Sequence, residues 1–340
     1  MIKFPSIGQY RNAIQNIKHV SSYVGQDIDG NAIFNNNILY PTLKFKGYVK
    51  LHGTNAAWSM DSNNISYQSR ERELSLESDN AGFYLWSVNH KLVIQSLFDE
   101  VITYVLPNRQ QILPPITIFG EWCGKGIQKA VGVSELDKMF VIFAVKVEEE
   151  YVELDNFPNL KSNEHHIYNI ADFQNYEIDI NFNHPEIVQN ILSDITLKVE
   201  EECPVAKHFG ISGVGEGVVW HCVSEGWNNP STWFKVKGEK HSSSKVKTLA
   251  SVDIETIESI NMFVEQVVTE NRLKQSIDKL KEAGLTIEMK NMGDFIRWVY
   301  NDILREEADT IIANQFDVKK LGSPIANKCR IWFANNLNGV

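Results

Sequence analysis

The spacing of apolar positions changes near Leu249, and this change divides the chain into two parts. Before this point, short apolar runs alternate with polar turn segments, which is the pattern of β-strands. After it, apolar residues recur at intervals of three and four, which places them on one face of a helix. The pattern therefore predicts a mixed α+β domain over residues 1–245 and an all-helical domain over residues 250–340.

The first part contains most of the predicted elements. Two extended runs, 43–60 and 65–70, are joined by the polar turn 61–64 and predict a hairpin. Further β-rich apolar runs predict strands over residues 116–122, 139–147, 215–223 and 231–238. Helices are predicted over residues 8–20 and 83–106 and near 185–200, and a polar loop is predicted over 25–37. Little else between residues 156 and 210 can be assigned.

The second part contains helix signals alone. Residues 257–268 carry an apolar face with helical spacing. Asp294 is a suitable N-cap for a second helix, since Phe295 and Val299 follow it with that spacing. Ser323 and Pro324 have the order of a helix start, a capping residue followed by proline at the first helical position.

Composition and charge narrow the class of protein. The 340 residues are 43% apolar and 22% charged, which is ordinary for a globular protein, and the formal net charge is −10. A negative charge argues against a nucleic-acid partner, but one short stretch is locally basic and could neutralise phosphates. It contains Lys235, Lys237, Lys240, His241, Lys245 and Lys247. By itself this stretch fits a solvated linker equally well.

Targeting and cysteine signals indicate a cytosolic protein. No run of apolar residues is long enough to span a membrane, and the first fifteen residues lack the apolar core of a signal peptide. The four cysteines lie far apart without a CxxC pair, so we expect reduced thiols rather than disulfides or a zinc site. A monomer in the cytoplasm is expected, and a phage- or virus-encoded protein acting in a host cytoplasm fits the same signals.

The first candidate for a catalytic segment is Lys50-Leu51-His52-Gly53-Thr54-Asn55. A lysine attacks a phosphate only as the neutral amine, so a site that uses it must lower its pKa with cations or burial. Lys235 and Lys237 are candidates for those cations, because residues two apart on a strand point to the same face. A lysine three residues before a glycine is common on protein surfaces, so this element alone has little weight.

Four further side chains follow in a fixed order. Arg70 lies after the predicted hairpin, Glu121 ends an apolar strand before a glycine-rich loop, Phe143 lies on a buried strand and Glu216 precedes another. With the lysines, this order resembles the motifs of the covalent nucleotidyltransferase superfamily, which contains polynucleotide ligases and mRNA capping enzymes. That resemblance implies an α+β, ATP-grasp-like core of antiparallel sheets flanked by helices.

The resemblance is most specific to the RNA ligase 2 family, the phage-type ATP-dependent ligases that seal nicks in duplex RNA. It rests on KxHGTN followed by FGE-x-x-G-x-GIQ, and it extends over most of the chain, including the C-terminal helices. DNA ligases and capping enzymes usually have an aspartate at the position of His52 and continue into a β-barrel. Residues 250–340 have no strand pattern for such a barrel.

The resemblance implies three chemical steps. Lys50 would attack the α-phosphate of ATP and carry AMP, which would pass to an RNA 5′-phosphate before a 3′-OH displaces it. Lys235 and Lys237 would offset charge on the α-phosphate. Arg70 would hold the AMP phosphate or the RNA 5′-phosphate with its fork of donors. The implied partners are ATP and RNA with 5′-phosphate and 3′-OH ends, expected as nicks in a duplex.

The remaining implied roles concern nucleotide and metal binding. Glu121 would contact the ribose, and Phe143 would stack on adenine. Glu216 would anchor Mg²⁺, with Mn²⁺ as an alternative. His52 and Asn55 would organise the nucleophile loop and the AMP phosphate.

Two positions depart from the family pattern, and two other functions stay open. Ala144 occupies a position where an acidic residue is expected, and Lys125 replaces a small residue or proline in the glycine-rich loop, where it could add a phosphate contact. A DNA ligase or capping-type enzyme would share most of these motifs. A non-catalytic RNA-binding relative would be expected to have lost the nucleophile first, yet Lys50, Glu216 and the lysine pair are present.

Overall fold

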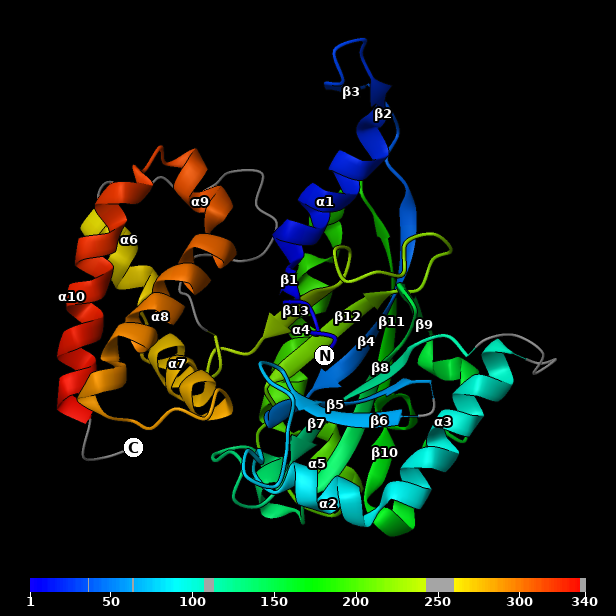
Figure 1. Ribbon diagram of the computed structural model, residues 1–340. Coiled ribbons are helices and arrows are strands. Elements are labelled where there is room, and N and C mark those ends of the chain that lie inside the picture. The colour runs from blue at the N-terminus through cyan, green and yellow to red at the C-terminus, as the bar shows by residue number, and fades with distance from the viewer. Residues whose placement is uncertain (36, 63, 107–112, 243–259, 337–340) are drawn as a thin grey trace. The chain divides into compact units, whose positions relative to one another are not determined.

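The chain folds into two compact units (Figure 1). The computed structural model describes residues 1–35, 37–62, 64–106, 113–242 and 260–336. Unit 1 is Met1–Gly238, with antiparallel sheets and flanking helices, and unit 2 is Glu239–Val340, with helices in its described residues. The predicted mixed α+β class is confirmed. The predicted domain boundary at residues 245–250 lies outside the described residues and stays a prediction.

The first sheet of unit 1 has five strands in the order β1-β13-β12-β4-β11. All neighbouring pairs are antiparallel except β1 and β13, which are parallel. The strands are β1 (Gly8–Gln9), β4 (Thr42–Lys50), β11 (Asn175–Asn181), β12 (Gly217–Cys222) and β13 (Phe234–Lys237). The apolar runs predicted at 215–223 and 231–238 are therefore strands at the centre and next to one edge of this sheet.

The second sheet follows the order β10-β8-β7-β5-β6, with β9 paired to β8. Its strands are β5 (Thr54–Asp61), β6 (Asn64–Ser69), β7 (Ile116–Cys123), β8 (Met139–Val147), β9 (Glu150–Val152) and β10 (Ile167–Asn169). The hairpin predicted from 43–60 and 65–70 is wrong in its first half. Only β5 pairs with β6, whereas β4 belongs to the first sheet, because the chain leaves one sheet and enters the other at residues 51–53.

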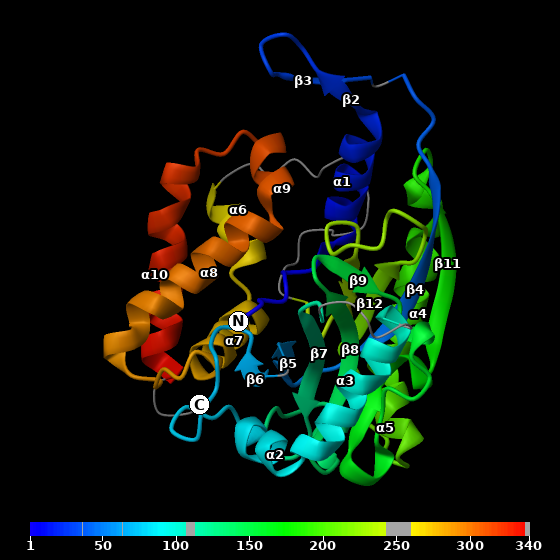
Figure 2. The ribbon, with the colours of Figure 1, turned by 45° about the vertical axis from the view of Figure 1, so that its right-hand side comes forward.

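Helices cover the outer faces of the sheets. Figure 2 shows α2 and α3 beside the second sheet, and α4 packs against β12 and β13 of the first. The α-helices of unit 1 are α1 (Tyr10–Ser22), α2 (Phe83–Asn89), α3 (Lys91–Val105), α4 (Gln189–Glu201) and α5 (Pro204–His208). Short 3₁₀ helices join these elements: η1 (Gly132–Glu135), η2 (Leu154–Asn156), η3 (Asn163–His165), η4 (Ile170–Asp172) and η5 (Pro185–Val188). The three helices predicted in this part are confirmed, with 83–106 divided into two.

Two regions of unit 1 differ from the expectation. The predicted loop 25–37 contains a two-stranded sheet, β2 (Tyr23–Gln26) and β3 (Ala32–Phe34), closed by a turn in which the Asp27 carboxylate accepts backbone hydrogen bonds from Asp29 and Asn31. Residues 156–210, largely unassigned from sequence, supply β10, β11 and α5. In β11, Tyr176, Ile178 and Ile180 alternate with exposed polar residues, a strand period that was overlooked in this mainly polar stretch, whereas β10 has only three residues.

Unit 2 is built from helices around one apolar core. They are α6 (Ile260–Val267), α7 (Glu270–Glu282), η6 (Met289–Asn291), α8 (Met292–Glu306), α9 (Ala308–Ala313) and α10 (Val318–Asn336). The predicted Asp294 cap is wrong, because Asn291 precedes the helix and Asp294 lies in its first turn. The predicted helix start at Ser323-Pro324 is also wrong. α10 begins at Val318 and contains Pro324, since Leu321 and Ile325 pack into the core on either side of it.

Two further expectations concern the state of the cysteines and the presence of a membrane-spanning helix. All four cysteines, Cys123, Cys203, Cys222 and Cys329, are buried and free. Within the described ranges, no helix is both long and apolar enough to cross a membrane.

Candidate active site

Strand register brings three of the predicted residues together. Lys50 is the last residue of β4, and Gly217 of the central strand β12 lies opposite both Lys50 and Lys237. Glu216 precedes Gly217, so its side chain is next to both lysines. Gly217 has a φ of +149°, and a Cβ there would lie 2.2 Å from the Val236 carbonyl oxygen, so a larger residue would push β12 and β13 apart.

Glu216 is the centre of this cluster. Its side chain is only 3% exposed. The Lys50 Nζ donates to Oε2 at 2.7 Å, the Lys237 Nζ lies 3.0 Å from Oε1, and the His52 Nδ1 lies 3.4 Å from Oε2. With Lys235 and Arg70 nearby, the cations of this region outnumber the carboxylates of Glu216 and Glu121, and the excess positive charge suits an anionic ligand.

The pKa values of these groups follow from burial and from the ion pairs. Burial favours a neutral Lys50, but the carboxylates of Glu216 and Glu121 outweigh it and raise the Lys50 pKa above its ordinary value. Burial likewise favours a neutral Glu216, yet Lys50 and Lys237 hold the pKa of Glu216 well below its usual range. For Lys237, burial and the charges of Lys50 and Lys235 outweigh Glu216 and lower the pKa.

The Lys50 result differs from the sequence-based expectation. A lowered pKa was expected from neighbouring lysines, but the structure places a carboxylate in contact with the amine instead. The Lys50 amine is therefore an ammonium group in this arrangement, and the negative charge of Glu216 must be offset before the amine can act as a nucleophile.

The loop after Lys50 is held by the second sheet. The backbone N–H of Gly53 donates to Glu121 Oε1 at 2.9 Å, and Gln128 Nε2 donates to the Gly53 carbonyl oxygen at 3.4 Å. A Cβ on Gly53 would lie 2.4 Å from the Trp122 carbonyl oxygen, so only glycine allows this close approach. Asn55 lies opposite Glu121 in the ladder between β5 and β7.

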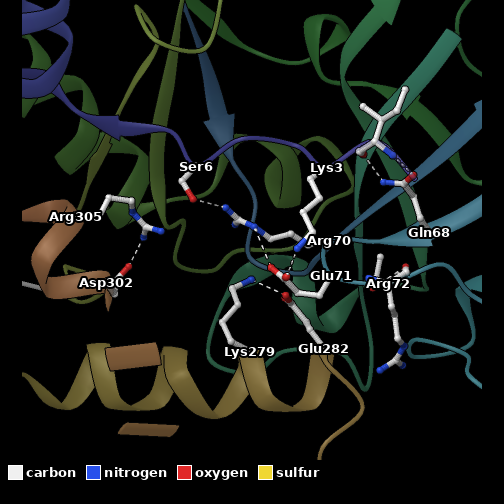
Figure 3. A network of polar contacts seen from close by, with 12 residues as sticks. Lys3, Ser6, Gln68, Arg70, Glu71, Arg72, Lys279, Glu282, Asp302 and Arg305 are labelled. Carbon is white, nitrogen blue, oxygen red and sulfur yellow. Dashed lines mark hydrogen bonds and ion pairs between the residues drawn. The ribbon is translucent and has the colours of Figure 1, made fainter. Parts of the chain in front are cut away.

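Arg70 lies close enough to Lys50 for its charge to favour a lower Lys50 pKa, whereas Phe143 lies on β8 of the second sheet. Arg70 follows β6, and its Nη2 donates to Ser6 Oγ at 2.6 Å (Figure 3). Phe143 lies at a bulge in β8, and its ring contacts the Phe4 ring with centroids 5.0 Å apart. Both residues therefore contact the N-terminal segment of the chain.

Lys235, Lys125 and Ala144 are further predicted positions that the structure describes. Lys235 lies opposite Val219, two residues before Lys237 on β13. Lys125 is exposed and lies 3.7 Å from Asp137, whereas Ala144 is buried opposite Phe119. In the predicted basic stretch, Lys245 and Lys247 lie outside the described residues.

Sequence reasoning missed the N-terminal contacts with this site. Phe4 and Ser6 contact two of the predicted residues, and Ile2 exchanges two hydrogen bonds with the Gln68 side chain. Residues 2–6 have no strand or helix periodicity, so nothing in their spacing indicated a role. Their mixture of one aromatic and several small or polar residues was the only local signal.

Comparisons with known proteins were made for sequence and for fold. No curated protein matches the chain. Among solved structures, Naegleria gruberi RNA ligase with pyrophosphate has a TM-score of 0.45 and 15% identity, covering 70% of this chain and 56% of that chain. A mutant of the same ligase with ATP and manganese has a TM-score of 0.44 and 16% identity, covering 70% and 57%. The present chain thus spans little more than half of the length of that ligase.

The family model described as RNA ligase matches residues 45–237. This range contains the lysine nucleophile candidate, Arg70, Glu121, Phe143 and Glu216, and it ends on Lys237. It covers more than half of the chain, and the chain therefore belongs to the RNA ligase family.

Proposed function

We propose that the protein is a monomeric, ATP-dependent RNA ligase that joins 3′-OH and 5′-phosphate ends through an AMP carried on Lys50. The observation that carries the proposal is the contact of Lys50 with Glu216 and of Glu216 with Lys237. A partly buried lysine within a cluster of net positive charge combines a nucleophile with a binding site for phosphate. Family membership directs this chemistry to RNA ends.

In the first step, the Lys50 ammonium releases a proton to solvent. Its Nζ then forms a bond to the α-phosphorus of ATP as the bond to pyrophosphate breaks, and a second proton leaves Nζ for solvent. Glu216 holds the first of these protons on Nζ through the 2.7 Å hydrogen bond, so its charge controls when the amine becomes reactive. Lys237, with Lys235 two residues away on the same strand, offsets the charge that grows on the phosphate oxygens. Phe143 would stack on the base, and Glu121, which already anchors the Gly53 loop, would contact the ribose.

The later steps use the same groups. A 5′-phosphate oxygen of RNA attacks the phosphorus of lysyl-AMP, which returns the amine of Lys50 and leaves an adenylylated RNA end. The 3′-OH of the other RNA end then attacks that 5′-phosphate, and AMP leaves as the phosphodiester forms. Arg70 would hold one of these phosphates, and His52 and Asn55 would keep the nucleophile loop in place.

A divalent cation, Mg²⁺ or Mn²⁺, fits the chemistry of Glu216. In the part of the chain that the structure describes, no group of three or more His, Cys, Asp and Glu side chains could hold a metal. Mg²⁺ in nucleotide sites is commonly held by one or two carboxylates, with phosphates and water completing the shell, and Glu216 suits that mode. When bound, the cation would offset the charge of the nucleotide phosphates.

Self-adenylylation tests the proposal directly. Incubation with ATP and Mg²⁺ should add the mass of one AMP to the intact protein, and peptide mapping should place it on Lys50. Lys50→Ala should abolish the adduct, whereas Lys44→Ala, an exposed lysine on the same strand, should retain it. An adduct on another residue, or one that persists in Lys50→Ala, would remove the basis of the proposal.

The preferred substrate is proposed to be a nick in duplex RNA. Sealing should be compared on matched RNA, DNA and hybrid nicks and on single strands, with ATP or GTP. Preference for DNA nicks would indicate a DNA ligase, and reaction with GTP would indicate a capping-type enzyme. Adenylylation without any sealing would leave a nucleotidyltransferase with a different acceptor.

Unit 2 is proposed to help recruit the RNA. Its last helix carries Lys319, Lys320, Lys328 and Arg330, which could contact phosphates without reading sequence. Truncation after residue 249 should leave self-adenylylation and the sealing of a pre-adenylylated nick largely intact. Sealing of an ordinary 5′-phosphate nick should fall. A folded truncated protein that seals ordinary nicks at the full rate would exclude this role.

A further inference from the structure

Residues 2–9, here called the strap, contact both sheets of unit 1. At one end, β1 of the strap pairs in parallel with β13, so that Gly8 lies opposite Phe234 and Gln9 opposite Lys235. Ile7, just before it, is buried. This end of the strap is therefore hydrogen-bonded to the strand that carries both motif lysines.

The other end of the strap is bound to the second sheet. The Ile2 backbone N–H donates to Gln68 Oε1 at 3.1 Å, and Gln68 Nε2 donates back to the Ile2 carbonyl oxygen at 2.5 Å. Gln68 is 1% exposed, so these bonds are shielded from water. Lys3 adds an exposed ion pair with Glu71 at 2.9 Å (Figure 3).

Between these ends, the Ser6 hydroxyl contacts a guanidinium group. Arg70 Nη2 donates to Ser6 Oγ at 2.6 Å, and Arg70 Nε lies 3.9 Å from the carboxylate of Glu71 (Figure 3). The Arg70 side chain is 25% exposed and comes from the end of a strand, where a long side chain has many rotamers. One short hydrogen bond to the Ser6 hydroxyl restricts that freedom.

The ring of Phe4 joins the two sheets. It lies 5.1 Å from the Phe119 ring and 5.0 Å from the Phe143 ring, both of the second sheet, and 6.3 Å from Trp233, which precedes β13 of the first. The rings of Phe4 and Phe143 are inclined by 68°, an edge-to-face arrangement that fixes the ring planes relative to each other. Phe4 is only 9% exposed.

We infer that the strap is a positioning element for the nucleotide, in which Phe4 sets the ring plane of Phe143 and Ser6 sets the guanidinium of Arg70. This inference rests on the proposed function, because it takes Phe143 and Arg70 as the groups that contact base and phosphate. Neither Phe4 nor Ser6 needs to touch the reacting atoms. Each acts through a neighbouring residue, Phe4 through Phe143 and Ser6 through Arg70.

The test separates nucleotide binding from chemistry in the full-length protein. Self-adenylylation rates are measured against ATP concentration for the wild type, Phe4→Ala, Phe4→Tyr, Ser6→Ala and Ser6→Thr. Phe4→Ala should raise the KM for ATP by about tenfold with a much smaller change in kcat, because the aromatic pair orients a binding group, and Phe4→Tyr should restore the wild-type KM. Ser6→Ala should lower kcat/KM by about fivefold, and Ser6→Thr should recover it because the hydroxyl is kept.

Lys44→Ala is the control, since it removes an exposed side chain of β4 that lies outside the strap. Its kinetics should equal those of the wild type. If Phe4→Ala is unfolded by circular dichroism, the Ser6 pair decides, because Ser6 is partly exposed and its replacement leaves the core intact.

The outcomes distinguish failure of the positioning role from failure of the proposed ligase function. An active wild type with unchanged KM and kcat/KM in Phe4→Ala and Ser6→Ala would overturn the positioning role and leave the ligase assignment standing. Loss of activity in Ser6→Ala that Ser6→Thr does not recover would also overturn it. A wild type that forms no lysyl-AMP would overturn the proposed function and this inference with it.

Discussion

Each unit buries an ion cluster, and the two clusters differ in charge balance and exposure. In unit 1, one carboxylate, Glu216, is contacted by Lys50 and Lys237, whose side chains are 24% and 13% exposed. In unit 2, one guanidinium, Arg272, is contacted by Asp302 at 2.9 Å and Glu307 at 3.1 Å. Arg272 and Glu307 have no exposed area, so that cluster is closed to solvent.

This difference distinguishes a candidate ligand-binding site from an ion cluster that only stabilises the fold. Arg272 also donates to the Val267 carbonyl oxygen, so its guanidinium joins α7, α8 and the residues that flank them. Its hydrogen-bonding partners are complete within the protein. Around Glu216, positive charge exceeds negative charge and remains accessible, so an anion from solution can complete the cluster. A buried ion pair by itself indicates neither role, but an accessible excess of one sign indicates a ligand.

The largest expected effect concerns the closed cluster. Arg272→Met should destabilise unit 2 by about 3–5 kcal/mol, because it removes the guanidinium that contacts the buried carboxylates of Asp302 and Glu307. Asp302 keeps its ion pair with Arg305 in this variant. Urea unfolding followed by circular dichroism measures the loss. Arg272→Met combined with Glu307→Gln should recover part of it. Equal stability of Arg272→Met and the wild type would show that the cluster is not structural.

The accessible cluster should respond in the rate of adenylylation. Lys237→Ala and Lys235→Ala should each slow self-adenylylation about a hundredfold, or ~3 kcal/mol, because each removes charge that stabilises the α-phosphate. Single-turnover adenylylation measures the effect, and circular dichroism checks that each variant is folded. Lys44→Ala again serves as the control. Near-normal rates in both variants would make this strand an ordinary basic surface.

The stability of the fold should depend on pH in opposite ways through Glu216 and Lys50. The folded-state pKa of Glu216 is depressed, so its ion pairs stabilise the fold above its unfolded pKa near 4.5, and this stabilisation is lost as pH falls through the folded value. The Lys50 pKa is raised, so its contribution is present below its unfolded value of 10.5 and is lost as pH rises through the folded value. Glu216→Gln should therefore flatten the acid side of the stability profile, below pH 4.5. An unchanged acid profile in urea unfolding would contradict the ion pairs.

The smallest effect is expected outside both clusters. Lys125 departs from the family pattern, but it is exposed and lies 3.7 Å from an equally exposed Asp137. Lys125→Gly should change the adenylylation rate by about twofold or less, since exposed ion pairs contribute little. A tenfold loss would show instead that this lysine contacts a phosphate of the nucleotide.

The order of motifs along the sequence identified the residues of the accessible cluster, but it did not predict which charges contact each other or the direction of the Lys50 pKa shift. Lys50, Glu216 and Lys237 were identified because their strands have clear apolar patterns and follow a known motif order. The contact between Lys50 and Glu216 depends on which strands pair and in which register, and a single sequence contains no direct signal for pairing between residues 166 positions apart. The strap was missed for a related reason, because its contacts are all tertiary and its own residues have no period.

Helix positions in unit 2 show the opposite limitation. There the period predicted the element, but local capping signals gave the wrong ends. Asp294 and Ser323-Pro324 both have the composition of a helix start, yet each lies within a helix that starts earlier. Burial of Leu321 and Ile325 outweighs the hydrogen bond that proline cannot make, so packing rather than local preference sets where α10 begins.

The pairing of β12 between β4 and β13 has a consequence for synthesis of the chain. A ribosome-bound chain that has emerged only as far as β11 already carries the lysine of β4 but neither Glu216 nor Lys237. The cluster forms only when β12 and β13 add to that strand, a closure across a long stretch of sequence that local structure cannot accelerate. An unfinished chain therefore has the lysine of β4 without Glu216 and Lys237. The cluster can form only after synthesis has passed β13, the last strand of unit 1.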